Sequence, residues 1–171
     1  MFSSTIPART RIATFTNLFD ARRSIFTAAP LLALVSFVPS YLITRVIALL
    51  IEIFGHDIAG ALPSFELKGL MLLVAVVLGP LFETLLLAVG MWVICKFVKN
   101  PWAASAISGV AWSIAHGYQA PLWALGTVWP FMVFSRAYLS WRPRNLSDAI
   151  GVAWLAHMIH NALAVACSYL P

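Results

Sequence analysis

The sequence has few charged residues: they make up 10% of its 171 positions, whereas hydrophobic residues make up 61%. Soluble domains carry about 25% charged and about 45–50% apolar residues. The composition therefore excludes a water-soluble globule with one buried core, and it excludes a disordered chain. Cysteine is also scarce. Cys95 and Cys167 both lie within apolar stretches, where a thiol usually acts as a small hydrophobic side chain rather than as a disulfide partner or metal ligand.

Acidic residues are outnumbered, with 6 Asp and Glu against 11 Lys and Arg, which gives a net charge of +5. The basic residues cluster at the ends of apolar runs. This pattern is typical of a membrane protein oriented by its basic loops and argues against binding to nucleic acid.

A membrane-spanning helix needs about 20 residues. The apolar stretches predict five such helices, which cover about 24–54, 69–95, 101–116, 122–141 and 149–171. A turn-forming run at 117–121 separates the third helix from the fourth. The predicted fold is all-α, a polytopic membrane helix bundle. We expect three parts: a basic N-terminal arm that can form an interfacial helix (1–23), a first span with an external loop (24–68), and a four-helix membrane core (69–171).

The predicted topology follows from the basic residues. Nine of the eleven fall on one side of this bundle: Arg9, Arg11, Arg22, Arg23, Lys96, Lys99, Arg136, Arg142 and Arg144. The positive-inside rule then places the N-terminus in the cytoplasm and the C-terminus outside. We expect an integral protein of a bacterial inner membrane. Arg45, within the first predicted span, either snorkels, faces another helix, or reflects a bend at Pro39.

Ionisable and strongly polar residues within spans are costly, so each is a candidate for function. This set contains Glu83, His116, His157, His160 and Asn161. At 1.5 Å per residue from the predicted cytoplasmic ends, Glu83, His116 and Asn161 lie about 20–22 Å deep, in one layer. His157 and Asn161 share a helix face, and His160 is offset from His157 by about 60°. Taken singly, each histidine or Asn161 can be an interhelical hydrogen-bonding group, and Glu83 can pair with Arg45.

Three short motifs contain these residues: Gly79-Pro-Leu-Phe-Glu83-Thr84-Leu-Leu-Leu-Ala88, Trp112-Ser-Ile-Ala-His116 and His157-Met-Ile-His-Asn161. In order and spacing they resemble the CPBP family of glutamic-type intramembrane proteases, which includes type II CAAX prenyl endopeptidases and Abi-like proteins linked to bacteriocin processing and immunity. The family pattern is Pro-x-x-Glu-Glu-x-x-x-Arg, Phe-x-x-x-His and His-x-x-x-Asn. The resemblance covers about residues 69–165.

The chain departs from this pattern at Thr84, Ala88 and Trp112. The first two replace a glutamate and an arginine four residues apart on a helix, where opposite charges can pair. Their joint loss indicates an ion pair replaced by neutral packing. The Thr84 hydroxyl is then expected to donate to the carbonyl of Pro80, one turn back.

The resemblance implies an intramembrane endopeptidase that cleaves a membrane-associated substrate. In it Glu83 and His116 activate a water molecule, and His157 and Asn161 stabilise the oxyanion. A carboxylate, two imidazoles and a carboxamide at one depth agree with that chemistry. The expected partners are the lipid bilayer and a peptide or protein with a hydrophobic or lipidated segment.

Three alternatives remain open at this point. The Thr84 and Ala88 departures are compatible with a catalytically inactive relative that binds peptides or scaffolds a membrane complex. A small ion-coupled carrier fits less well, because the five spans contain no internal repeat. We expect no cofactor, with zinc as the alternative, since Glu83, His116 and His157 supply zinc-type ligands but no HExxH sequence is present.

Overall fold

The computed structural model describes residues 15–55 and 69–169, and the described part of the chain is all-α, as predicted. A 3-10 turn (Phe15–Phe19) precedes α1 (Ile25–Ile53). The second span consists of α2 (Leu70–Leu73), a π-helical turn (Val74–Leu78) and α3 (Gly79–Phe97). Then follow α4 (Pro101–Gly117), α5 (Pro121–Trp141) and α6 (Leu146–Ser168). Most of the predicted N-terminal arm lies outside the described residues.

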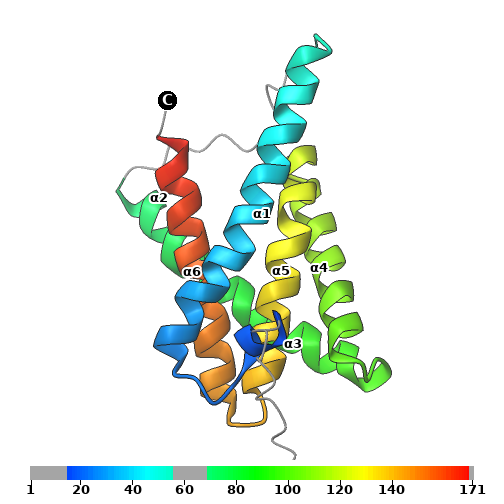
Figure 1. The fold of residues 1–171 in the computed structure, drawn as a ribbon, viewed down its shortest axis with the longest axis vertical. Coiled ribbons are helices and arrows are strands. Elements are labelled where there is room, and N and C mark those ends of the chain that lie inside the picture. Colours follow the sequence, from blue (N-terminus) through cyan, green and yellow to red (C-terminus); the bar gives the residue numbers. More distant parts are fainter. Residues whose placement is uncertain (1–14, 56–68, 170–171) are drawn as a thin grey trace, which may run out of the picture.

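The helices form one bundle in which the chain reverses direction at each connection (Figure 1). Helices α1, α4, α5 and α6 run roughly along its long axis, and α3 crosses them obliquely from α6 to α4. Within the described ranges, three helices are long and apolar enough to cross a membrane: Ile25–Ile53, Leu70–Phe97 and Leu146–Ser168. These apolar helices agree with the predicted membrane bundle.

Side-chain caps define where several helices begin. Asn100 accepts hydrogen bonds from the backbone N–H groups of Trp102 and Ala103 at the start of α4, and Asn145 accepts one from Asp148 at the start of α6. Such caps satisfy N–H groups that the helix itself leaves without an acceptor. The predicted break between the third and fourth spans is confirmed, because α4 ends at Gly117 and α5 begins at Pro121.

Prolines within α1 and α5 create the contacts between these two helices. A proline has no N–H, so the carbonyl four residues earlier loses its helical donor. In α1, Pro39 frees the carbonyl of Val35, which accepts a hydrogen bond from the Trp129 indole of α5 at 2.8 Å. In α5, Pro130 frees the carbonyl of Gly126, which accepts from the Ser40 hydroxyl of α1. The two helices thus satisfy each other's carbonyls.

Glycine permits the close approach of neighbouring helices at two points. A Cβ at Gly126 would lie 2.8 Å from the Thr44 hydroxyl of α1, and one at Gly109 of α4 would lie 2.6 Å from the carbonyl oxygen of Val128 in α5. Small residues at such crossings are typical of helix association in membranes.

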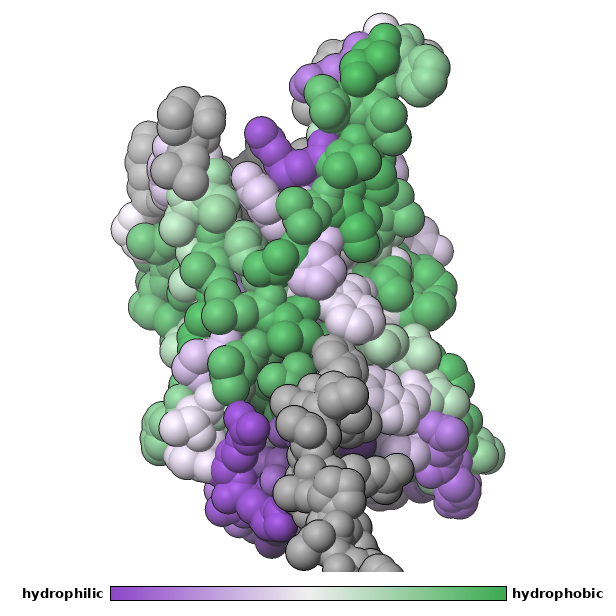
Figure 2. All heavy atoms as spheres, viewed as in Figure 1, coloured by the Kyte–Doolittle hydropathy of each residue, from purple (hydrophilic) through white to green (hydrophobic). Residues whose placement is uncertain are grey.

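Hydrophilic side chains gather at one end of the bundle, below a broad apolar band (Figure 2). This basic end contains the start of α1 and the α3–α4 and α5–α6 connections (Figure 1). Its exposed cations are Arg22, Arg23, Lys96, Lys99, Arg142 and Arg144. Arg144 joins two of these segments, since its Nη1 donates to the carbonyl oxygens of Ala21 and Arg23 at 2.9 and 3.2 Å.

Arg45 lies in the other half of α1, and α1 continues as a helix through Pro39. Its side chain is exposed, and the guanidinium carbon is 6.0 Å from the centre of the Tyr41 ring. Among the described residues Arg45 forms no ion pair with Glu83.

Candidate active site

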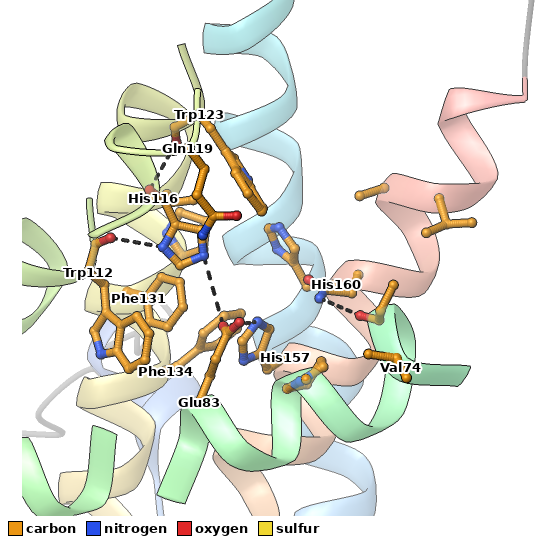
Figure 3. A pocket seen from close by; sticks show the side chains of 18 of the residues that line it. Val74, Glu83, Trp112, His116, Gln119, Trp123, Phe131, Phe134, His157 and His160 are labelled. Carbon is orange, nitrogen blue, oxygen red and sulfur yellow. Dashed lines mark hydrogen bonds and ion pairs between the residues drawn. The ribbon is translucent and has the colours of Figure 1, made fainter. Parts of the chain in front are cut away.

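A cavity of about 1170 Å³ lies between the second span and helices α4, α5 and α6. Most of its wall is apolar or aromatic, and Glu83, His116 and His157 face one another within it (Figure 3). The wall consists of Met71, Val74, Ala75, Gly79, Pro80, Glu83, Trp112, Ala115, His116, Gln119, Trp123, Thr127, Pro130, Phe131, Phe134, His157, His160, Asn161, Ala164, Val165, Ser168 and Tyr169. All five polar residues selected from the sequence therefore border one cavity.

Glu83 faces two histidines from two other helices. Its Oε2 lies 3.6 Å from Nε2 of His157 and 4.0 Å from Nε2 of His116. The carboxyl side chain is 31% exposed, whereas the two imidazole side chains are 5% and 7% exposed. These separations exceed a normal hydrogen bond, and catalytic contacts often shorten only when substrate binds.

Trp112 fixes the orientation of the His116 ring. Nδ1 of His116 lies 2.9 Å from the carbonyl oxygen of Trp112, one turn earlier in α4. A carbonyl oxygen only accepts, so Nδ1 carries a proton, and Nε2 is the ring nitrogen that faces Glu83. The edge contact with Trp123, at 4.6 Å between ring centres, holds the other side of the ring.

His157 is oriented by stacking rather than by a second hydrogen bond. Its ring lies 4.6 Å from that of Phe134, with an interplanar angle of 23°. Nδ1 is buried without a hydrogen-bond partner. Because Nε2 faces a carboxylate, which accepts, the neutral tautomer with the proton on Nε2 fits this position.

Asn161 lies at the same cavity, but its amide is already engaged. Nδ2 donates to the carbonyl oxygen of Ala75 in the π-helical turn at 2.9 Å. This carbonyl is free because the N–H of Gly79 donates to Val74 and Pro80 has no N–H to donate. One amide hydrogen of Asn161 therefore holds the turn that leads to Glu83, and this bond does not use the second amide hydrogen.

Trp154 was not selected from the sequence, although it contributes to the same arrangement. Its indole Nε1 donates to the carbonyl oxygen of Val77 at 3.2 Å. Residues 154, 157 and 161 share one face of α6, so this face contacts the second span at three points. The sequence held no signal for this bond, because the carbonyl that Pro80 leaves without a helical donor is not that of Val77.

His160 points away from Glu83, toward α1, as its angular offset from His157 allowed. Its Nδ1 lies 2.9 Å from the Ser36 hydroxyl oxygen. That hydroxyl donates to the carbonyl of Ala33, so it accepts from His160. The residue therefore joins α6 to α1 beside the cavity.

The structure corrects one expectation about the first motif. Thr84 is fully buried, but its hydroxyl has no hydrogen-bond partner, and the predicted bond to the Pro80 carbonyl is absent. Ala88 is half-buried against the core.

In the described ranges, no three His, Cys, Asp or Glu side chains are grouped so that they could hold a metal ion. A catalytic zinc ion is held by three protein ligands of these types.

Comparison with known proteins gives one match. A family model described as Type II CAAX prenyl endopeptidase Rce1-like matches residues 65–163, which is more than half of the chain and includes all three motifs. No curated protein and no solved structure matches the chain.

Proposed function

The chain belongs to the Type II CAAX prenyl endopeptidase Rce1-like family, and from this premise we propose that it hydrolyses a peptide bond of a membrane-associated substrate by means of water activated by Glu83. The observation that carries the proposal is the convergence of Glu83, His116 and His157 from three helices on one cavity.

Glu83 serves as the general base. Its carboxylate takes a proton from a water molecule while the water oxygen bonds to the carbonyl carbon of the substrate. His116 orients that water, because the lone pair on Nε2 accepts from the second O–H. The Trp112 carbonyl supports this role, since it keeps the proton on the opposite nitrogen.

The developing oxyanion receives hydrogen bonds from Nε2–H of His157 and from the free amide hydrogen of Asn161. Each such donor is worth about 3–4 kcal/mol in comparable sites. The proton held by Glu83 then passes to the leaving nitrogen, directly or through His116, and the C–N bond breaks to give a carboxylic acid and an amine. No step requires a metal ion.

The test is cleavage by purified protein in lipid vesicles. The probes are two sets of fluorescence-quenched peptides. One set has an apolar segment around the scissile bond, and the other has a C-terminal CAAX sequence that carries a farnesyl group, because such a sequence directs prenylation. We expect Glu83→Gln to lower kcat by a factor of at least about 10³.

Glu52→Gln is the matched control, because this carboxylate is exposed at the end of α1 away from the cavity. It should cleave like the wild type. Equal cleavage by wild type and Glu83→Gln would refute the mechanism, and binding of peptides by a wild type that never cleaves them would instead identify an inactive relative.

A further inference from the structure

Arg136 differs from the exposed cations of the basic end because it is half-buried within a helix. It lies in α5, about 9 Å before Arg142 along the helix axis. Its side chain extends toward the basic end, since Nη1 donates to the hydroxyl of Ser140, one turn further on. An exposed cation at the end of a span is accounted for by the charge bias of membrane loops, whereas a half-buried cation within a span calls for a partner.

Two aromatic rings hold the guanidinium of Arg136. Its central carbon lies 5.4 Å from the centre of the Phe19 ring, in the 3-10 turn, and 5.0 Å from that of Trp102, at the start of α4. The two rings contact each other edge to face, with 5.5 Å between their centres. Such contacts fix the position of a planar guanidinium. Three segments that are distant in the sequence thus hold one cation in place.

The described residues do not neutralise this cation. The two carboxylates of the basic end, Asp20 and Asp148, lie 3.0 Å each from Arg22 and Arg144, and no described carboxylate forms an ion pair with Arg136. Its Nε is buried without a hydrogen-bond partner. In the part of the chain that the structure describes, Nη1 is the one guanidinium nitrogen that donates a hydrogen bond. The unused donors of an arginine suit the oxygens of a phosphate.

The surroundings favour a lipid phosphate over a soluble anion. The basic end borders the broad apolar band (Figure 2), and large apolar side chains are exposed beside its cations. Phe26 lies three residues after Arg23, and Phe97 directly follows Lys96. Lipid acyl chains cover exposed side chains of this kind in a membrane, which brings the headgroup phosphates to the level of the neighbouring cations.

We propose that Arg136 binds the phosphate of an anionic phospholipid at the basic end, between the 3-10 turn and helices α4 and α5. The excess of cations over carboxylates around it favours a lipid of net negative charge, such as phosphatidylglycerol, over a zwitterionic one. Basic pockets between membrane helices bind headgroups of this class. The bound phosphate neutralises the guanidinium and joins the three segments that hold it. This inference does not depend on the proposed function.

The first test measures which phospholipid stays with the purified protein. Protein is extracted with detergent from vesicles of equal parts dioleoylphosphatidylglycerol and dioleoylphosphatidylcholine. It is then washed in about 0.5 M sodium chloride, which screens exposed charges more than half-buried ones, and the retained lipids are measured by mass spectrometry. We expect the wild type to retain phosphatidylglycerol at least about fivefold over phosphatidylcholine, and Arg136→Gln to lose this preference.

Arg142→Gln is the matched control, because it removes an exposed cation from the same end of α5. It should keep most of the preference. An unchanged preference in Arg136→Gln, or an equal loss in both variants, would overturn the site at Arg136.

A second measurement uses the unaltered chain and so does not depend on the folding of any variant. Thermal unfolding is followed in detergent with added dioleoylphosphatidylglycerol, with dioleoylphosphatidylcholine, or with inorganic phosphate at the same concentration. We expect phosphatidylglycerol alone to raise Tm, by about 2–4 °C. Equal protection by inorganic phosphate would show a site for a free anion, and equal protection by phosphatidylcholine a general effect of lipid, and either result would overturn the proposal.

Discussion

Asn161 donates a hydrogen bond from its side-chain amide to the carbonyl oxygen of Ala75, 2.9 Å away, and so joins α6 to the π-helical turn before the helix of Glu83. Trp154 makes a second bond of this kind to Val77. The face of α6 that presents His157 to Glu83 thus also fixes where α3 begins. π-Helical turns are frequent at functional sites, and here the turn sets the position of the proposed base.

Removing the Trp154 bond should therefore reduce catalysis without affecting substrate binding. Trp154→Phe keeps an aromatic ring and loses only the N–H donor. We expect kcat to fall about tenfold with KM unchanged, because a small displacement of a catalytic group strongly lowers the rate of the chemical step. We expect the free energy of unfolding to fall by about 1 kcal/mol. Steady-state kinetics in vesicles separate the two constants. Trp92→Phe, at an exposed position of α3, is the control, and equal effects of the two changes would contradict the positioning role.

His160 and Ser36 should affect stability more than turnover. Their hydrogen bond joins α6 to α1, and interhelical bonds in membranes contribute about 0.6 kcal/mol on average. We expect His160→Ala and Ser36→Ala to be non-additive in a double-mutant cycle of unfolding free energy, with kcat reduced much less than in His116→Ala. A loss of kcat in His160→Ala as large as that in His116→Ala would place His160 among the catalytic groups.

Thr84 carries a buried hydroxyl with no partner, and an unsatisfied buried polar group is unfavourable. Thr84→Val replaces that hydroxyl by a methyl group of similar size. We expect the free energy of unfolding in detergent to rise by about 1 kcal/mol. A fall of the same size would mean that the hydroxyl has a partner in the membrane-embedded protein.

Chelators should leave cleavage intact, because the proposed mechanism uses only protein groups and a water molecule. Activity is measured after prolonged incubation with o-phenanthroline, followed by zinc in a parallel sample. Activity lost to the chelator and restored by zinc would overturn the metal-free mechanism in favour of the zinc alternative.

Counting residues along the predicted spans was enough to bring Glu83, His116 and Asn161 to one depth, because an α-helix advances by a fixed distance per residue. The break at Gly117–Pro121 and the different direction of His160 were likewise visible in the sequence. Orientation of the chain in the membrane remains a prediction.

The engagement of Asn161 could not be predicted in the same way. Helical periodicity assumes one hydrogen-bond pattern throughout, whereas Val74–Leu78 adopts the wider π pattern and frees a carbonyl that α6 must satisfy. The predicted hydrogen bond of Thr84 to the Pro80 carbonyl was wrong for a related reason. A hydroxyl one turn from a carbonyl is close enough to donate to it, but the spacing in the sequence does not determine the side-chain rotamer.

The carbonyls freed by Pro39, Pro80 and Pro130 have a consequence for biosynthesis. A lone helix in lipid has no other donor for such a group, and Trp129, Ser40 and Asn161 supply these donors from other helices. Two of these carbonyls, in α1 and the second span, are synthesised before the helices that satisfy them. A nascent chain that stops before α6 therefore carries a carbonyl without a donor within the bilayer, and completion of the last helix supplies that donor.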